Sequence, residues 1–256
     1  SDVTGTFLTE TGDYRYLNGQ VKGETFEFGT FDGAHAFLFR ATLDNNNALQ
    51  GEFWSGSYPE ETWSATRDAD VALRDGGALT YLNKGFERLE FSFPDESGTM
   101  VSLQDERFTD KVVIVTLVGS WCPNCHDETA LLAELYTRYS GEGFEVIALM
   151  FEHLEDEDAA WTQINAFRTK FDLQYPTLLA GISEKTQAAS KLPALNHILS
   201  FPTAIFIDRR GAVRHIHTGF TGPGTGVHYE ALRQDTIERI ESLLAEPATP
   251  TVSRSN

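Results

Sequence analysis

The chain has only two cysteines, Cys122 and Cys125, among its 256 residues. Two cysteines cannot form the dense disulfide framework that stabilises small secreted domains. A bridge between residues three positions apart closes a very short loop, so it restrains the unfolded chain very little. We therefore interpret the pair as a chemical feature rather than a stabilising one.

Basic residues are also scarce, with 20 Lys and Arg against 38 Asp and Glu and a formal net charge of -18. Binding to nucleic acid or to an anionic membrane needs clustered Lys and Arg, so we expect neither as a partner. The acidity itself is explained by solubility. A hydrophobic fraction of 41% is that of a folded protein, and the length allows two domains.

Long apolar runs are lacking as well. The longest, residues 112–118, has the length of a buried strand, and crossing a bilayer needs roughly 18 residues. We therefore expect no intrinsic membrane span. No basic segment followed by an apolar one marks a leader, yet the chain begins at Ser1 without Met. Whether a signal or a membrane anchor precedes Ser1 in a longer precursor stays open, as does the oligomeric state.

The first 75 residues favour β structure, because short Phe-, Tyr-, Thr- and Val-rich segments alternate with turn signals and show no helical period. We predict a small antiparallel sheet or barrel, with a hairpin turn at Asn18-Gly19. Residues 44–47 form a polar turn, since they lack the glycine and terminal Glu of a calcium loop. The aromatics Trp54, Tyr58 and Trp63 are expected in the core, with a partner-binding platform or a dimer contact as the alternatives.

Beyond the Asp75-Gly76-Gly77 junction, segments of strand and helix alternate. The expected strands are residues 91–94, 100–103, 111–118, 144–151, 177–180, 203–208 and 213–218, and the expected helices are residues 124–139, 157–171, 184–192 and 229–244. This order predicts an α/β fold, a mixed sheet flanked by helices on both faces. The predicted domains are an N-terminal antiparallel β domain (1–75), a second, α/β domain (76–246) and a flexible tail (247–256).

The segment Trp121-Cys122-Pro123-Asn124-Cys125 stands between a buried strand and a helix. Cys122 then lies at a helix N-terminus, where unpaired N–H groups and the helix dipole favour a thiolate. Pro123 suits the first helical turn. Cys125 follows one turn later and faces Cys122, as a resolving thiol faces an attacking thiolate. Trp121 would shield the pair.

Together with Phe201-Pro202-Thr203 downstream, this segment resembles the TlpA/ResA-type thiol–disulfide oxidoreductases of the thioredoxin superfamily, over residues 86–246. The other matching pieces are residues 111–115, the helix with Glu128, and residues 204–208. The resemblance implies a thioredoxin-like fold and an exported, often periplasmic protein. It also implies disulfide exchange with a protein substrate and an upstream thiol donor, with no cofactor beyond the Cys122–Cys125 disulfide.

The same resemblance implies that Pro202 is a cis proline that presents the backbone of Phe201 to a substrate beside Cys122. An ordinary trans proline opening a strand is the alternative. Thioredoxin itself carries a buried Asp six residues before its first cysteine, where this chain has Thr116. Glu152, after the next strand, is our candidate for the proton-transfer acid, and a surface carboxylate is the alternative.

We favour a disulfide reductase working in an oxidising compartment, although the motif fixes neither the direction of electron flow nor the substrate. A peroxiredoxin-like thiol peroxidase is an alternative, but such enzymes carry Thr or Ser where this chain has Gly119. A haem-attached electron-transfer protein is another, because His126 completes a C-x-x-C-H string. If no haem is attached, we expect His126 to be an exposed residue of the helix. The last alternative function is a binding module whose cysteine pair is vestigial.

Two histidines, His215 and His217, fall on one face of the strand 213–218. A metal site would need further ligands at a defined spacing, and the sequence offers none. We therefore predict no metal site and interpret both histidines as structural.

Overall fold

The computed structural model describes residues 1–58 and 60–247. The chain forms two compact units: residues 1–74 with 221–230, and residues 75–220 with the chain from residue 231 onward. The separate folding of domains 1–75 and 76–246 stays a prediction. The predicted tail, apart from residue 247, lies outside the described residues.

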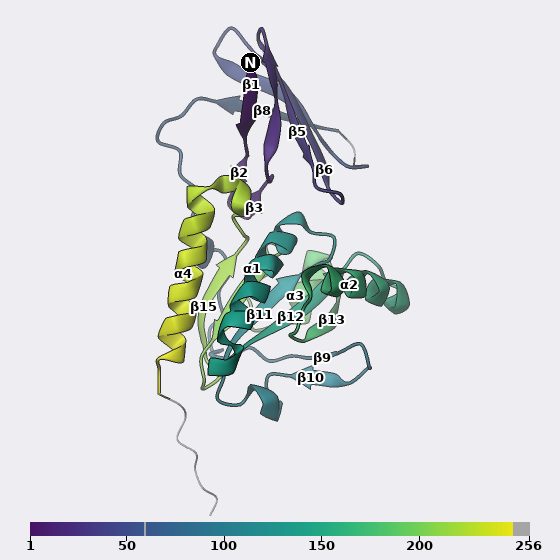
Figure 1. Cartoon of the computed structure of the whole chain (residues 1–256), viewed down its shortest axis with the longest axis vertical. Helices are drawn as coiled ribbons and strands as arrows, with labels where there is room; N and C mark the ends of the chain where they lie inside the picture. The colour runs from purple at the N-terminus through teal and green to yellow at the C-terminus, as the bar shows by residue number, and fades with distance from the viewer. Residues whose placement is uncertain (59, 248–256) are drawn as a thin grey trace, which may run out of the picture. The chain divides into compact units, whose positions relative to one another are not determined.

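The first unit is built on a six-stranded antiparallel sheet in the order β1-β4-β5-β6-β7-β8 (Figure 1). Its strands are β1 (Asp2–Gly5), β4 (Leu17–Lys22), β5 (Thr25–Phe31), β6 (Ala36–Leu43), β7 (Ala48–Ser55) and β8 (Glu61–Thr66), and β2 (Leu8–Thr9) with β3 (Gly12–Asp13) forms a small hairpin. Within the described residues, β1 and β8 each pair with one neighbour. The unit is therefore an open sheet and not a barrel.

The predicted hairpin turn at Asn18-Gly19 is wrong. Both residues lie inside β4, and Gly19 pairs with Phe28 of β5. A Cβ atom on Gly19 would lie 1.9 Å from the carbonyl oxygen of Glu27, so this glycine permits a close approach of two strands. The chain turns instead at Gly23, whose φ is 63°.

The core of the first unit is aromatic. Leu17, Phe39 and Phe53 are buried, and Trp63 is among the rings packed against them, as predicted. Successive residues of a strand point to opposite faces, so Trp54, next to Phe53, lies on the other face under the guanidinium of Arg40. Tyr58 is 64% exposed, so the core prediction is wrong for this residue.

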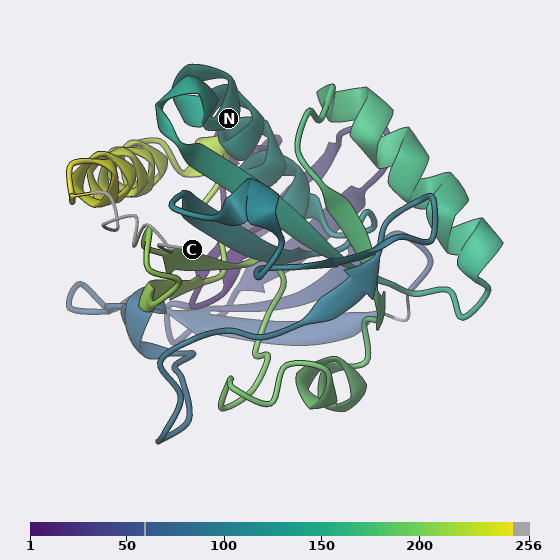
Figure 2. The ribbon, with the colours of Figure 1, turned by 90° about the horizontal axis from the view of Figure 1, so that it is seen from below.

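The second unit contains a five-stranded mixed sheet in the order β13-β12-β11-β14-β15. Its strands are β11 (Val112–Val118), β12 (Phe144–Glu152), β13 (Thr177–Ile182), β14 (Thr203–Ile207) and β15 (Val213–Thr218), and its helices are α1 (Pro123–Tyr139), α2 (Glu157–Phe171), α3 (Lys185–Ser190) and, from residue 231 on, α4 (Val227–Leu244). Helices α1 and α2 lie on one face and α3 on the other (Figure 2). This confirms the predicted thioredoxin-like α/β fold.

The short elements complete the second unit. The hairpin of β9 (Ser92–Pro94) and β10 (Met100–Ser102) forms a separate two-stranded sheet. Three 3-10 turns in this unit are η1 (Gly76–Ala78), η2 (Glu106–Phe108) and η3 (Ser140–Glu142), while η4 (Pro223–Thr225) belongs to the first unit. None of the helices in the described ranges combines the length and the apolar character that a bilayer crossing requires.

The two central strands position the site. Every residue of β11 and β12 is buried, as their continuous apolar runs predicted. Both strands run parallel, so their carboxyl ends meet at one edge of the sheet. Cys122 follows the end of β11, and Glu152 is the last residue of β12.

Candidate active site

The two cysteines begin helix α1. Cys122 is the N-cap residue, with extended backbone, and Pro123 occupies the first turn. The Cys122 sulfur accepts a hydrogen bond from the backbone N–H of Cys125 at 3.3 Å, in the way that an N-cap side chain satisfies an orphan donor. The strand–loop–helix sequence therefore places one sulfur against the positive end of the helix.

Burial separates the roles that the two thiols can take. Cys122 keeps 4% of its surface exposed and Cys125 keeps none, so only Cys122 is open to a substrate. Burial, and then the neighbouring Cys122, raise the pKa of Cys125 well above its ordinary value, and Glu128 acts in the same direction. Cys125 thus needs a proton acceptor before it can attack as a thiolate.

The segment before β14 lies against the cysteines. The peptide bond between Phe201 and Pro202 is cis, the isomer that the sequence analysis expected. The Cys122 thiol donates a hydrogen bond of 3.4 Å to the carbonyl oxygen of Phe201. Residues 79 positions apart in the chain therefore meet at the reactive sulfur.

Trp121 is fixed on three sides. Its indole N–H donates to the Phe151 carbonyl at 2.9 Å, its ring stacks on His153 at 4.0 Å, and its edge meets Phe201 at 5.9 Å. A Cβ atom on Gly119 would lie 2.3 Å from the indole nitrogen, so a residue without a side chain is required there. Gly119 is thus explained by the packing of Trp121.

Glu152 is fully buried, which makes the surface alternative wrong. Its carboxylate accepts hydrogen bonds from the backbone N–H of Ser120 at 3.0 Å and from the Ser120 hydroxyl at 2.7 Å. Burial raises the pKa of Glu152, and the two bonds from Ser120 oppose the rise. Glu152 therefore holds the loop before Trp121. Its role as proton-transfer acid stays a prediction.

A second buried carboxylate, Glu128, was missed as a site residue by the sequence analysis. It lies on the buried face of α1 and accepts a hydrogen bond of 2.5 Å from the hydroxyl of Thr116 on β11. Burial raises the pKa of Glu128 to about 8, against the effect of the Thr116 bond. An acid on the helix thus stands beside the strand position where thioredoxin has its Asp. One feature of the sequence could have identified it. Glu128 falls on the same helix face as Leu131, Leu132 and Leu135, and a carboxylate on a buried apolar face is rare unless it has a function.

His126 is buried with 7% of its surface exposed, so the exposed alternative is wrong. Its Nε2 lies 2.7 Å from the carbonyl oxygen of Ser120, and its Nδ1 lies 3.0 Å from the ammonium of Lys170. The ring also packs against Phe167 and Phe171 of α2. His126 therefore ties the active-site loop to the second helix.

The described residues contain no group of three or more His, Cys, Asp or Glu that could hold a metal ion. His215 and His217 share one face of β15, as predicted, with ring centres 6.3 Å apart.

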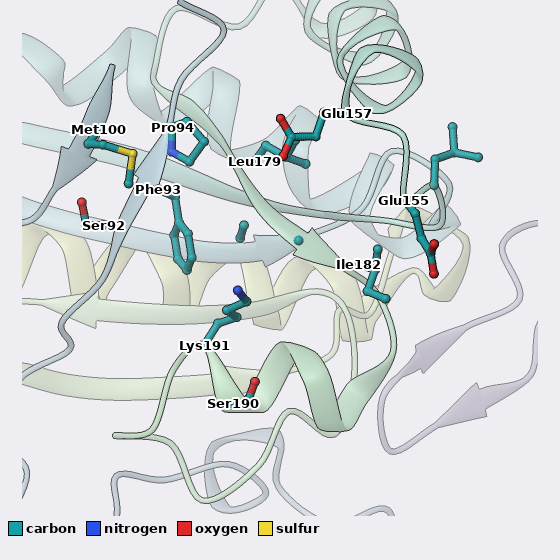
Figure 3. A pocket seen from close by; sticks show the side chains of 13 residues that line it. Ser92, Phe93, Pro94, Met100, Glu155, Glu157, Leu179, Ile182, Ser190 and Lys191 are labelled. Carbon is teal, nitrogen blue, oxygen red and sulfur yellow. The ribbon is translucent and has the colours of Figure 1, made fainter. Parts of the chain in front are cut away.

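A surface cavity of about 590 Å³ lies between β9, β13 and α3. Phe93 points from β9 toward Lys191, and the acidic side chain of Glu155 lies on another side (Figure 3). Leu154 and Glu155 belong to the loop that follows Glu152, but neither cysteine lines the cavity. The cysteines therefore sit outside this hollow.

Comparisons with known proteins identify the family. The Redoxin family matches residues 84–231, more than half of the chain. Thioredoxin-like protein YneN of Bacillus subtilis is 28% identical over 140 residues, 54% of this chain and 73% of that protein. Thiol-disulfide oxidoreductase ResA of Bacillus thuringiensis is 30% identical over 129 residues, 50% of this chain and 66% of that protein.

Among solved structures, a DsbF homologue from Corynebacterium diphtheriae is 22% identical and covers 66% of this chain and 95% of its own, with a TM-score of 0.48. The Redoxin match leaves out residues 1–83, which include all eight strands of the first unit. It includes both cysteines, Glu128 and Pro202. The chain therefore belongs to the Redoxin family, and its redox unit is similar to ResA-type thiol–disulfide oxidoreductases.

Proposed function

We propose that the chain is a disulfide reductase that exchanges disulfides with protein substrates through Cys122 and Cys125. One observation carries this proposal: a slightly exposed N-cap thiol lies 3.4 Å from the carbonyl oxygen before a cis proline, with a fully buried thiol one turn behind it. An accessible nucleophile backed by a protected resolving thiol suits two successive exchanges.

The first exchange uses Cys122. Its thiolate attacks a substrate disulfide, the substrate S–S bond breaks, and the leaving sulfur takes a proton from solvent. In the second exchange, the ionised form of Glu128, a minority at neutral pH because its pKa is about 8, takes the proton of Cys125, and Cys125 attacks the Cys122 sulfur. The Cys122–Cys125 bond forms, the mixed disulfide breaks, and the second substrate sulfur leaves. The substrate gains the two electrons that the cysteine pair loses.

The direction of electron flow is the second part of the proposal. It depends on the reduction potential of the Cys122–Cys125 pair against that of the substrate, and we propose that the pair is the more reducing of the two. We expect a reduction potential near the roughly -270 mV typical of thioredoxin. A potential near about -120 mV, typical of a strong oxidant, would contradict the proposed direction.

We further propose a periplasmic or other extracytoplasmic location. The partners would be a protein disulfide as substrate and an upstream thiol as electron donor. The likeness to a family of exported proteins supports this part. Fractionation of the native cells tests it, and recovery only with cytoplasmic markers would count against it.

The alternatives find less support at the same residues. The Thr or Ser of a thiol peroxidase is replaced by Gly119, where a Cβ atom would strike Trp121. A haem attached to the two cysteines would need a His126 nitrogen as its iron ligand, yet one nitrogen contacts Ser120 and the other Lys170. A vestigial pair would not need a buried acid beside the resolving thiol.

Insulin reduction tests the activity. With dithiothreitol as donor, the chain should speed the precipitation of insulin chains, and Cys122→Ser should abolish the effect. Cys125→Ser should leave a slow residual rate, since the mixed disulfide then depends on the donor for release. An unchanged rate in Cys122→Ser would overturn the proposed function. A hydrogen peroxide assay with the same donor separates a reductase from a peroxidase.

A further inference from the structure

Three residues form a row across the sheet behind the cysteines. Thr116 of β11 pairs with Ala204 of β14, and Ala204 pairs with His217 of β15. Laterally paired residues point to the same face of a sheet, so all three side chains face α1. Thr116 is the residue that donates to Glu128. The histidine that the sequence analysis interpreted as structural is thus two strands away from the partner of the buried acid.

The small side chain of Ala204 leaves space in this row. A cavity of about 20 Å³ is lined by Glu128, Ala204, His217 and Thr236, with apolar residues around them. A volume above about 10–15 Å³ is enough for one water, provided that polar groups are present to bind it. The carboxyl, the imidazole and the Thr236 hydroxyl supply them. One water here would connect Glu128 to His217.

A second histidine continues from His217 toward the surface. His215, two residues earlier on the same face of β15, has its ring centre 6.3 Å from that of His217. His215 also lines an open surface pocket of about 310 Å³. The two rings thus lead from an internal cavity to a pocket that water enters.

The glycine pair at the start of the second unit closes over both rings. A Cβ atom on Gly76 would lie 2.8 Å from the His217 ring, and one on Gly77 would lie 2.7 Å from the His215 ring. Only residues without a side chain allow this backbone approach. Asp75-Gly76-Gly77, which the sequence marked as a junction, therefore packs directly against both imidazole rings.

We propose that His217 is a proton-relay residue, which exchanges protons with Glu128 through one water in the cavity and passes them by way of His215 to solvent. This proposal rests on the proposed function, because Glu128 must lose a proton each time Cys125 gives one up. His217 touches no reacting sulfur and acts through Glu128.

The proton balance is complete without another reactant. The Cys125 thiol protonates the Glu128 carboxylate as the Cys122–Cys125 bond forms. Glu128 then protonates the water, which gives a proton to one nitrogen of His217, while the other nitrogen releases a proton toward His215 and solvent. When a thiol donor re-reduces the pair, the same groups return a proton to Cys125.

The charges around the two histidines allow each imidazole to bind a proton briefly without holding it. Asp75 before η1 and Asp235 on α4 attract a proton to His217, while Arg239 on α4 repels it. Burial outweighs these charges and lowers the pKa of His217, and burial together with Arg239 and His217 lowers that of His215 to about 4. Glu128 faces His217 from α1 across the cavity. Both rings are thus neutral at rest and pass the proton on.

The test separates the two exchanges. Reduced protein reacts with 5,5′-dithiobis(2-nitrobenzoate), and stopped-flow absorbance follows the coloured thiolate. The first equivalent reports the attack of Cys122, and the second reports the attack of Cys125. We expect His217→Phe and the cavity-filling Ala204→Val to slow only the second phase, by roughly tenfold or more. The solvent deuterium isotope effect on that phase should rise, which a purely structural defect would not cause.

His197→Phe is the matched control, because it removes an exposed imidazole of the same unit and should change neither phase. His217→Gln, which keeps a hydrogen-bonding group but cannot shuttle a proton at neutral pH, should behave like His217→Phe. His217→Gln also tests the relay if His217→Phe does not fold. An unchanged second phase and isotope effect in His217→Gln and Ala204→Val would overturn the relay. A native chain that releases no second equivalent would instead refute the proposed function.

Discussion

Two buried carboxylates near the cysteines differ through their hydrogen bonds. Glu152 accepts two bonds from Ser120, whereas Glu128 accepts one from Thr116 and has its pKa raised to about 8. An acid that titrates near neutral pH can both take and release a proton in each cycle. Glu128 is therefore better suited to proton transfer, and Glu152 is better suited to holding the loop.

The raised pKa of Glu128 makes stability depend on pH. The folded chain binds this proton more tightly than the unfolded chain, so the free energy of unfolding falls as pH rises from 4.5 to about 8. Glu128→Gln should remove that fall and stabilise the chain above pH 8, by up to about 5 kcal/mol. Urea unfolding at pH 5 and pH 9 measures the difference.

Ala130→Gln is the matched control for this experiment, because it adds the same amide at an exposed position of the same helix and removes no titratable group. It should leave the dependence of stability on pH unchanged. Equal pH dependence in Glu128→Gln and the native chain would show that the carboxyl is not held protonated by burial.

At the scale of elements, the loop between β11 and α1 depends on Gly119. Gly119→Ala would place a Cβ atom 2.3 Å from the Trp121 indole nitrogen and 2.7 Å from the Phe151 carbonyl oxygen. We expect the indole to move and lose its bond to Phe151, and disulfide exchange to slow roughly tenfold or more. The indole N–H resonance and the insulin assay report the two effects. Gly141→Ala, with open space around its Cβ position, should change neither.

In the first unit, the pairing of β4 with β5 depends on Gly19. Gly19→Ala would bring a Cβ atom within 1.9 Å of the Glu27 oxygen and should cost about 2–4 kcal/mol. Hydrogen–deuterium exchange over residues 17–31 should accelerate. Gly5→Ala, in edge strand β1 with nothing near its Cβ position, serves as the control. Unchanged exchange in Gly19→Ala would mean that the strands pair differently.

These elements also mark how far sequence reasoning reaches. Buried strands and amphipathic helices have a strong period, so the central sheet and α2 could be predicted to within a few residues. The hairpin prediction at Asn18-Gly19 was wrong because glycine is favoured both in tight turns and where two strands approach closely. Glu128 was missed because its role depends on Thr116, which lies on another element. Local patterns identify the cysteines, and tertiary contacts identify the acid.

At the scale of the whole molecule, the chain combines a Redoxin-family unit with a second unit whose β-strands lie outside the matched range. The net charge of -18 disfavours the binding of acidic substrate proteins at low salt, because like charges repel. The redox unit contains the two thiols and Glu128, which the proposed exchange uses, and the histidines of β15, which the proposed proton relay uses. The account of function therefore rests on that unit alone.

The central claim is that Cys122 attacks a substrate disulfide and Cys125 resolves the adduct. Trapping tests it most directly: Cys125→Ser is incubated with a peptide containing a disulfide, acid-quenched and mapped by mass spectrometry. We predict one peptide joined to Cys122 in a stable mixed disulfide, and no trapped adduct in the native chain. An absence of adduct in Cys125→Ser, or an equally stable adduct on Cys125 in Cys122→Ser, would contradict the account.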